Sequence, residues 1–206
     1  MNGLTIEQKE DNTSSCNYRV LAISGSLRSA SLNTKLLRAA IDLAPLDMTI
    51  ELYEQLRELP HYDPDQDGDD RAQAVTNLRN RIKLADGLLI STPEYNYGIP
   101  GSLKNLIDWA SRPSIGSVIW HKPIAIIGVT SGNFGTVRAQ MNLRQILLWT
   151  DSDLVSRPEL LVFRGNDRFS INGKLTDVST ADLLRGVLEA LRKRIGINRV
   201  EFQGDV

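Results

Sequence analysis

Residues Tyr18 to Thr34 read YRVLAISGSLRSASLNT, and this stretch decides the fold. Its first part, Tyr18 to Ser24, is a short apolar run that ends at Gly25, which is typical of a strand buried on both faces before a turn. From Asn33 to Ala44 the apolar residues recur at intervals of three and four, which predicts one buried stripe on a helix. The stretch therefore predicts a strand, a polar loop and a helix, the repeating unit of a parallel α/β sheet.

The same alternation continues along the chain. Strands are expected at 48–53, 87–92, 123–130 and 155–162, and helices at 72–85, at the segment that ends with Trp109, at 137–149 and at 181–195. Strands separated by helices are parallel, because each right-handed crossover returns the chain to the same edge of the sheet. The sequence thus predicts an α/β fold, a three-layer α/β/α sandwich around a five-stranded parallel sheet. Ligands of such sheets bind beyond the carboxyl ends of the strands, here in the loops after Ser24, Thr92 and Thr130.

The composition excludes several classes of protein. The 206 residues carry 24 basic and 25 acidic side chains, a formal charge of -1, so no global field attracts nucleic acid or an anionic membrane. The single cysteine, Cys16, has no second thiol to pair with, which favours a reducing cytoplasm. No run approaches the ~20 apolar residues of a membrane span, and the first residues lack the apolar core of a secretory signal.

Three regions are expected along the chain: a flexible N-terminal leader at 1–17, one folded domain at 18–196 and a C-terminal tail at 197–206. The acidic run HYDPDQDGDD at 61–70 has aspartates at alternating positions, as calcium loops do. Because it lacks the closing glutamate of such a loop, we interpret it as a solvated loop and expect no metal site.

The first loop, GSLRSASLNT at 25–34, lies between a strand and the start of a helix, where free backbone N–H groups and the helix dipole favour an anion. Serine hydroxyls, the Asn33 amide and the Arg28 guanidinium are suitable donors to a phosphate. Only one glycine is present, so the loop is not a dinucleotide fingerprint, and a terminal monophosphate such as that of FMN fits better. The alternative, that Ser31 or Asn33 only caps the helix, is equally consistent with this loop alone.

The second loop, STPEYNYGIPGSLKNLIDWASR at 91–112, combines two prolines, two glycines and an aromatic pair between a strand and a helix. Proline fixes the backbone, and glycine lets it approach a flat ligand closely. Tyr95 or Tyr97 could pack on a ring face, although partial burial of an ordinary tyrosine is the alternative. The loop is therefore a candidate site for an isoalloxazine ring.

Together, PEYNYGIPGSLKNLIDWASR and the upstream GSLRSASLN closely resemble the NADPH-dependent FMN reductase family, which includes quinone, chromate and azo-dye reductases. The resemblance implies a flavodoxin-like sheet of order 2-1-3-4-5. It also implies that the FMN phosphate is held by Ser26, Arg28, Ser31 and Asn33. The ring would be lined by Pro93, Glu94, Tyr95, Asn96 and Gly98, and by Ser131, Gly132 and Gly135 of the third loop.

The implied activity is transfer of electrons from NADPH or NADH through FMN to free flavin, quinones, azo compounds or chromate-like oxyanions, by ping-pong hydride transfer. No catalytic acid or base is required. Glu94 either orients the flavin or bonds a backbone amide in its own loop. Arg28, Arg112 and Arg138 are possible partners of a 2′-phosphate of NADPH.

The resemblance further implies a homodimer or homotetramer, with the helix at 143–149 at an interface. Arg144 either pairs across that interface or is an ordinary surface arginine. Two other functions remain open: a non-enzymatic FMN electron carrier of the flavodoxin type, which the weak net charge disfavours, and a nucleotide-binding regulatory module that has lost flavin.

Overall fold

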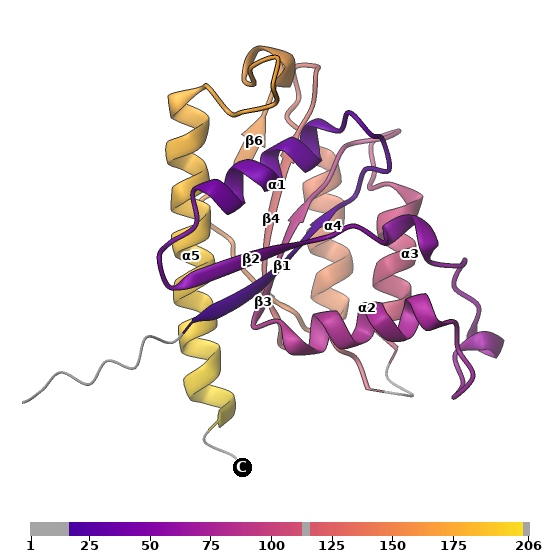
Figure 1. Ribbon diagram of the computed structural model, residues 1–206. Coiled ribbons are helices and arrows are strands. Elements are labelled where there is room, and N and C mark those ends of the chain that lie inside the picture. The colour runs from indigo at the N-terminus through magenta and orange to yellow at the C-terminus, as the bar shows by residue number, and fades with distance from the viewer. Residues whose placement is uncertain (1–16, 113–115, 204–206) are drawn as a thin grey trace, which may run out of the picture.

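A computed structural model describes residues 17–112 and 116–203 (Figure 1). Its sheet is built from β1 (Tyr18–Ser24), β2 (Met48–Tyr53), β3 (Gly87–Ser91), β4 (Pro123–Val129), β5 (Asp153–Leu154) and β6 (Leu160–Val162). Every pairing is parallel, and the order is β2-β1-β3-β4-β5, with β6 also pairing with β4. The predicted parallel sheet and its strand order are confirmed.

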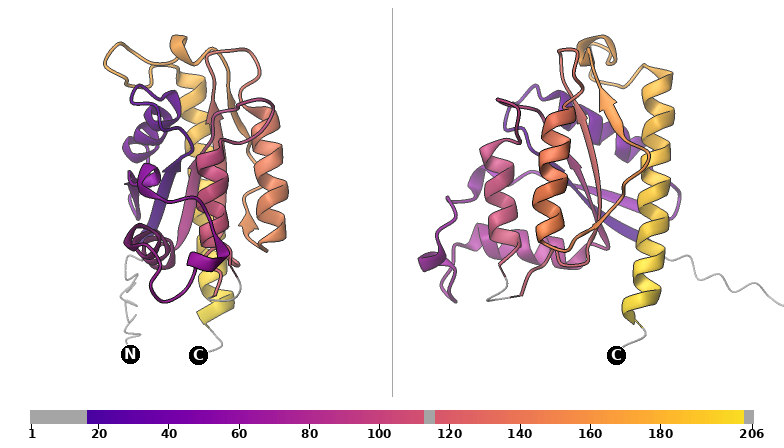
Figure 2. Two further views of the ribbon diagram at one scale, coloured as in Figure 1. Left: turned by 90° about the vertical axis from the view of Figure 1, so that its right-hand side faces the viewer. Right: turned by 180° about the vertical axis from the view of Figure 1, so that it is seen from behind.

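In the described part of the chain, five α-helices cover the two faces of the sheet: α1 (Leu32–Asp42), α2 (Gln73–Leu84), α3 (Gly101–Ala110), α4 (Val137–Trp149) and α5 (Val178–Gln203). One hydrophobic cluster joins α1 and α5 to the sheet, and a second joins α2, α3 and α4 to its other face. Figure 2 shows α3 and α4 in front of the sheet when the molecule is seen from behind. This arrangement is the predicted three-layer sandwich.

Strand β4 shows why the centre of the sheet is apolar throughout. All seven of its residues are buried, and successive side chains point to opposite faces. Ala125 and Ile127 therefore pack with α1 and α5, whereas Ile124 and Ile126 pack with the other helices. Each fully buried aliphatic side chain of this size contributes about 1.5–3 kcal/mol through the removal of apolar surface from water.

The fifth strand differs from the expectation of one strand at 155–162. The structure has instead β5, which lies just before this range, and β6 at its end, and these two short strands pair with the beginning and the end of β4 respectively. Pro158 lies between them and has no N–H to donate to a ladder, so a continuous strand is interrupted there.

The last helix is longer than expected, which corrects the division at Gly196. Helix α5 continues to Gln203, and its last turns contact the amino ends of the strands. The Asn198 amide donates to the carbonyl of His121 at 2.8 Å, and Arg199 pairs with Asp86 at 2.7 Å. Residues 197–203 therefore belong to the folded unit.

The expected leader lies almost wholly outside the described residues, which begin at Asn17. Within the part of the chain that the structure describes, no helix is both long and apolar enough to cross a membrane.

Asp177 immediately precedes α5 and is the basis of a pH prediction. Its Oδ1 accepts hydrogen bonds from the Thr180 N–H at 2.8 Å and from the hydroxyls of Ser179 and Thr180, and Oδ2 pairs with Arg168. These bonds, led by the Thr180 hydroxyl, hold the pKa of Asp177 well below its ordinary value. A carboxyl whose pKa falls on folding stabilises the fold above its unfolded pKa, and the contribution is lost as pH falls.

We expect Asp177→Ala to lower the free energy of unfolding at pH 7 by about 1–2 kcal/mol, as loss of a helix N-cap does. The difference from wild type should be constant down to pH ~5 and shrink below pH ~4, where the unfolded carboxyl titrates. Urea unfolding at several pH values measures it. Asp182→Ala, an exposed position on the same helix, is the control, and an equal loss in both variants would contradict the prediction.

Candidate functional site

The carboxyl ends of β1, β3 and β4 meet at one edge of the sheet, so the three loops selected from the sequence lie together. Ser24 and Ser91 are neighbours in register, and Ser91 in turn is next to Ile127. Gly25 allows the first two loops to approach each other, because a Cβ there would lie 3.1 Å from Leu103 and 3.3 Å from Pro93. The parallel sheet therefore assembles the candidate site.

The first loop presents donors to an anion. The backbone N–H groups of Leu27, Ser29 and Ala30, and those of Leu32 and Asn33 in the first turn of α1, have no hydrogen-bond partner among the described residues. The exposed guanidinium of Arg28 likewise has no ion-pair partner within 17–112 and 116–203. A helix N-terminus with free N–H groups and a nearby arginine fits a phosphate group.

Two serines shape this loop. Ser31 is the N-cap of α1, and its Oγ accepts a hydrogen bond from the Thr34 N–H at 3.2 Å, so the capping interpretation holds for Ser31. The Ser26 Oγ accepts from the Arg28 N–H at 3.4 Å. Both hydroxyls keep a proton that can be donated to a phosphate oxygen.

The Asn33 side chain has a different task from the one predicted. Only 3% of the residue is exposed, and its amide bonds three groups of the sheet. Nδ2 donates to the Val129 carbonyl at 3.0 Å, while Oδ1 accepts from the Val129 N–H at 3.1 Å and from the Ser91 hydroxyl at 2.8 Å. The amide is therefore directed into the interior, and only the backbone N–H of Asn33 faces the loop as a donor.

The second loop forms a tight turn from Tyr95 to Gly98. The N–H of each of these residues donates to the carbonyl of the other at 3.0 Å, and Asn96 and Tyr97 have positive φ angles of 50° and 68°. This pair of left-handed residues is the pattern of a type I′ turn. The turn leaves Tyr95 and Tyr97 exposed by 53% and 71%, although the Arg138 guanidinium covers one face of the Tyr97 ring.

The contacts of Glu94 bear on its two predicted roles, to orient the flavin or to bond a backbone amide of its own loop. Its Oε2 accepts from the N–H groups of Arg138 and Ala139 at 3.0 and 3.2 Å, in the first turn of α4, and Oε1 pairs with the Arg138 guanidinium. Glu94 thus bonds backbone amides of α4 rather than of its own loop, at the helix end where the dipole favours a carboxylate. It holds the second loop to α4.

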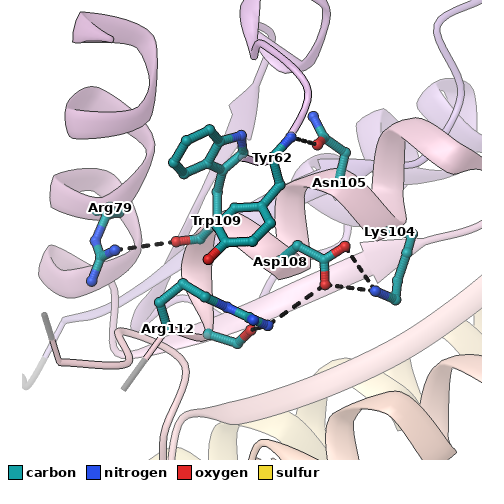
Figure 3. A network of polar contacts seen from close by, with 8 residues as sticks. Tyr62, Arg79, Lys104, Asn105, Asp108, Trp109 and Arg112 are labelled. Carbon is teal, nitrogen blue, oxygen red and sulfur yellow. Dashed lines mark hydrogen bonds and ion pairs between the residues drawn. The ribbon is translucent and has the colours of Figure 1, made fainter. Parts of the chain in front are cut away.

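Arg138 is held by this ion pair and by two aromatic rings. Its guanidinium lies 3.9 Å from the Tyr97 ring centre and 4.5 Å from that of Phe134. The third predicted cation, Arg112, lies beyond the far end of α3, near Tyr62 and Asp108 (Figure 3). Three arginines were named as partners of a 2′-phosphate. Of these, only Arg28 both lies in one of the three loops and has a guanidinium with no ion-pair partner among the described residues.

The third loop has one predicted glycine with a structural role. Gly135 has a φ of 58°, and a Cβ there would lie 2.9 Å from the backbone of Leu161, so it faces β6 rather than a ligand. Ser131 and Gly132 are exposed. The loop is tied to the segment after β6, where the Arg164 N–H donates to the Gly132 carbonyl at 2.8 Å.

Tyr53, the last residue of β2, has a shifted pKa. Burial raises its pKa to about 12, so its hydroxyl stays protonated at neutral pH. A proton-transfer role at the site is therefore not assigned to it.

Arg144, expected on the interface helix, contacts its own chain. Its guanidinium donates to the Val155 carbonyl at 3.0 Å.

Comparison with known proteins identifies the family of the chain. The family model described as NADPH-dependent FMN reductase matches residues 18–167. The NAD(P)H-dependent FMN reductase of Pseudomonas aeruginosa is 43% identical over 84% of this chain and 93% of that protein. A 2-hydroxy-1,4-benzoquinone reductase of a Burkholderia species is 38% identical over 83% and 92%. The flavoenzyme NAD(P)H:(acceptor) oxidoreductase of Paracoccus denitrificans superposes with a TM-score of 0.81, at 35% identity over 88% and 98% of the two chains.

The interior role of Asn33 gives a prediction about stability. Asn33→Ala would leave the N–H and carbonyl of Val129 and the Ser91 hydroxyl without partners, and each buried unpaired group costs about 1–3 kcal/mol. We expect a loss of at least about 2 kcal/mol, measured by urea unfolding without ligand. Asn80→Ala, an exposed asparagine on α2, is the matched control and should change stability by less than about 0.5 kcal/mol. An Asn33→Ala protein as stable as wild type would show that the hydrogen bonds of the Asn33 amide do not stabilise the fold.

Proposed function

Because the chain belongs to the NADPH-dependent FMN reductase family, we propose that it passes electrons from NAD(P)H to quinones through FMN held at the carboxyl edge of the sheet. Family membership makes the chain an FMN-dependent enzyme that uses NAD(P)H. The observation that carries the proposal is the first loop, where two serines and Arg28 converge with backbone N–H groups that have no partner among the described residues, while the loop after the adjacent strand β3 carries two exposed tyrosines.

We assign the phosphate to the first loop and the ring to the other two. Ser26, Arg28, Ser31 and the first N–H groups of α1 would hold the phosphate. The backbone of the turn at Tyr95 to Gly98, together with Pro93, Ser131 and Gly132, would line the ring. We assign no direct contact with FMN to three other side-chain positions, Asn33, Glu94 and Gly135. Their contacts are with other parts of the chain and hold the three loops in place.

Bound FMN supplies a two-electron redox centre that accepts hydride from nicotinamide and delivers electrons to an acceptor. The protein's part is to fix the phosphate, to leave one ring face open and to exclude a charged side chain from that face. We propose ping-pong kinetics, because one open face has to serve the nicotinamide and the acceptor in turn.

The charges at the edge favour a neutral planar acceptor over an oxyanion. Arg138, the cation nearest to the exposed tyrosines, is already neutralised by Glu94, and aromatic rings lie against it. Tyr95 and Tyr97 offer ring faces on which a quinone can stack. The Burkholderia relative is named for reduction of a benzoquinone, which supports this choice of substrate class.

The first test is the visible spectrum of the protein with FMN, followed by anaerobic NADPH. We expect bound flavin that bleaches on addition of NADPH and recovers when a benzoquinone is added. Flavin that binds but stays oxidised would indicate an electron carrier. A protein that refuses FMN would contradict the proposal.

Arg28→Ala separates phosphate recognition from ring recognition. A hydrogen bond to a charged group contributes about 1.5–3 kcal/mol, so FMN affinity should fall roughly tenfold or more. Affinity for riboflavin, which has no phosphate, should not change. Arg38→Ala removes the same charge from an exposed position on α1 and serves as the control in flavin fluorescence titrations. Equal losses for FMN and riboflavin would contradict the assignment of Arg28.

We also propose a homodimer or homotetramer in the cytoplasm, the compartment that supplies the reduced nicotinamide. The exposed side of α4 carries Met141, Leu148 and Trp149, exposed by 60%, 75% and 91%. Apolar side chains that gather on one exposed helix face mark an interaction surface.

Sedimentation velocity should give a mass of at least twice that of the 22.9-kDa chain. Leu148→Lys should lower that mass, because it places a charge in the apolar contact. Leu46→Lys, fully exposed elsewhere, should leave it unchanged. A wild-type monomer would overturn the assembly and leave the proposed chemistry untouched.

A further inference from the structure

Residues 163–168, which follow β6, lie at the same edge of the sheet as the three loops, at the top of Figure 1 in orange. We call them the post-β6 segment. The Gly165 N–H donates at 2.8 Å to the carbonyl of Thr130, where the third loop begins. A Cβ at Gly165 would collide with Val129 and lie 3.0 Å from Leu32, the first residue of α1. The segment is therefore packed between the third loop and the start of α1.

Arg164 has an uncommon backbone conformation within this segment. Its φ is 49°, in the left-handed region that residues other than glycine seldom adopt. Its N–H donates to the Gly132 carbonyl at 2.8 Å, and its carbonyl accepts from the Asp167 N–H at 2.9 Å. A strained residue persists where the surrounding contacts fix it, and such residues are frequent at ligand sites. The backbone therefore holds Arg164 in a fixed position beside the third loop.

The Arg164 guanidinium is available to an anion. The residue is exposed, and its Nε donates to the Asn133 Oδ1 at 3.3 Å. Neither Nη1 nor Nη2 has a hydrogen-bond or ion-pair partner among the described residues. The bond to Asn133 orients the guanidinium plane and leaves the edge formed by the two Nη atoms, which can bind a phosphate through two parallel hydrogen bonds.

The three arginines named from the sequence leave a 2′-phosphate of NADPH without a partner. Arg28 is assigned to the flavin phosphate. Arg138 is paired with Glu94, and Arg112 lies beyond the far end of α3. Arg164 is a further cation at the carboxyl edge of the sheet, and it has no acidic partner within the described residues.

Phe163 places an aromatic ring next to this cation in the chain. Its side chain is 44% exposed. The guanidinium of Arg168 lies 5.1 Å from the ring centre and is itself bound to Asp177 at 2.7 Å. A ring with a cation over one face keeps its other face for a nucleobase, because bases stack on aromatic side chains. Phe163 and Arg164 are therefore suited to a purine and a phosphate respectively.

We propose that the post-β6 segment binds the adenosine end of NADPH, with the 2′-phosphate on Arg164 and the adenine on Phe163. The inference rests on the proposed placement of the flavin ring beside the third loop. A nicotinamide stacked on that ring carries its adenosine end out over the rim of the site, and the post-β6 segment forms the rim that is bonded to Gly132. An arginine at the 2′-phosphate selects NADPH over NADH, which has a hydroxyl there.

The first test compares NADPH and NADH as electron donors to the FMN-loaded protein, with a benzoquinone as acceptor. Arg164→Ala should lower kcat/KM for NADPH about tenfold, mainly through KM, and should change kcat/KM for NADH by less than about twofold. Arg164→Lys, which keeps the charge without the two parallel donors, should recover part of the preference. Arg38→Ala removes the same charge from an exposed position on α1 and should not change the preference.

Phe163→Ala gives a second reading. It should lower kcat/KM for NADPH and for NADH by the same factor, because both nucleotides carry the adenine. A variant that loses activity with NADPH alone would contradict the assignment of the adenine to Phe163.

A binding measurement separates recognition from turnover. In calorimetry, 2′,5′-ADP should bind the FMN-loaded protein about tenfold more tightly than 5′-AMP, which lacks only the 2′-phosphate, and Arg164→Ala should abolish the difference. Equal affinities in wild type, or an unchanged preference for NADPH in Arg164→Ala, would overturn the inference. A parallel loss of FMN affinity in Arg164→Ala, measured by flavin fluorescence, would assign Arg164 to the flavin and also overturn it. A wild-type protein that oxidises neither nucleotide would instead overturn the proposed function.

Discussion

The buried amide of Asn33 fixes the start of α1 against the ends of β3 and β4. It bonds both the N–H and the carbonyl of Val129, and also the Ser91 hydroxyl, so one side chain aligns the three elements whose loops make the site. The N–H groups at the beginning of α1 can serve an anion only if that helix end is held at the edge of the sheet. A buried, fully bonded polar network of this kind makes the position of the loop unique.

A second constraint separates the charges of the site. Glu94 joins the second loop to α4 and neutralises Arg138, and the rings of Tyr97 and Phe134 lie against the same guanidinium. The ring side of the edge is therefore aromatic, and its nearest guanidinium is balanced. On the phosphate side, Arg28 keeps an unpaired charge within the described part of the chain. An anionic group and a neutral flat ring are thus directed to different halves of one edge.

Much of the fold follows from local patterns in the sequence. Alternation of apolar runs with helical stripes predicts the parallel sheet, because both signals lie within a few residues of each other. The patterns failed at 155–162, where the polar residues and Pro158 of VSRPELLV leave only the last three residues in a strand. They also failed at the end of α5, where contacts of Asn198 and Arg199 with distant residues extend the helix past a glycine. Tertiary contacts decide such boundaries.

The sequence identified three loops that the sheet brings to one edge, but it did not predict the contacts of single residues within them. Asn33 and Val129 are 96 positions apart, and Glu94 and Arg138 are 44 apart. Nothing in a local motif separates an amide that bonds a ligand from one that bonds a distant strand, since both require the same donors and acceptors. The loop residues with exposed side chains, such as Arg28 and Tyr95, keep the interpretation that the motif suggests.

Helix α4 links the site to the proposed assembly surface. Its first turn is held by Glu94, and Met141, exposed by 60%, lies three residues beyond Arg138 on the same rigid helix. A second copy packed on the exposed side of α4 would therefore lie within about one helical turn of the aromatic rim formed by Tyr97 and Phe134. Such a partner would shield an open ring face from bulk water. It would leave the proposed phosphate side accessible, because that side follows β1, which β3 separates from β4 in the sheet. Assembly would thus shape the half of the site that meets the acceptor, and α1 would retain the half that holds the cofactor.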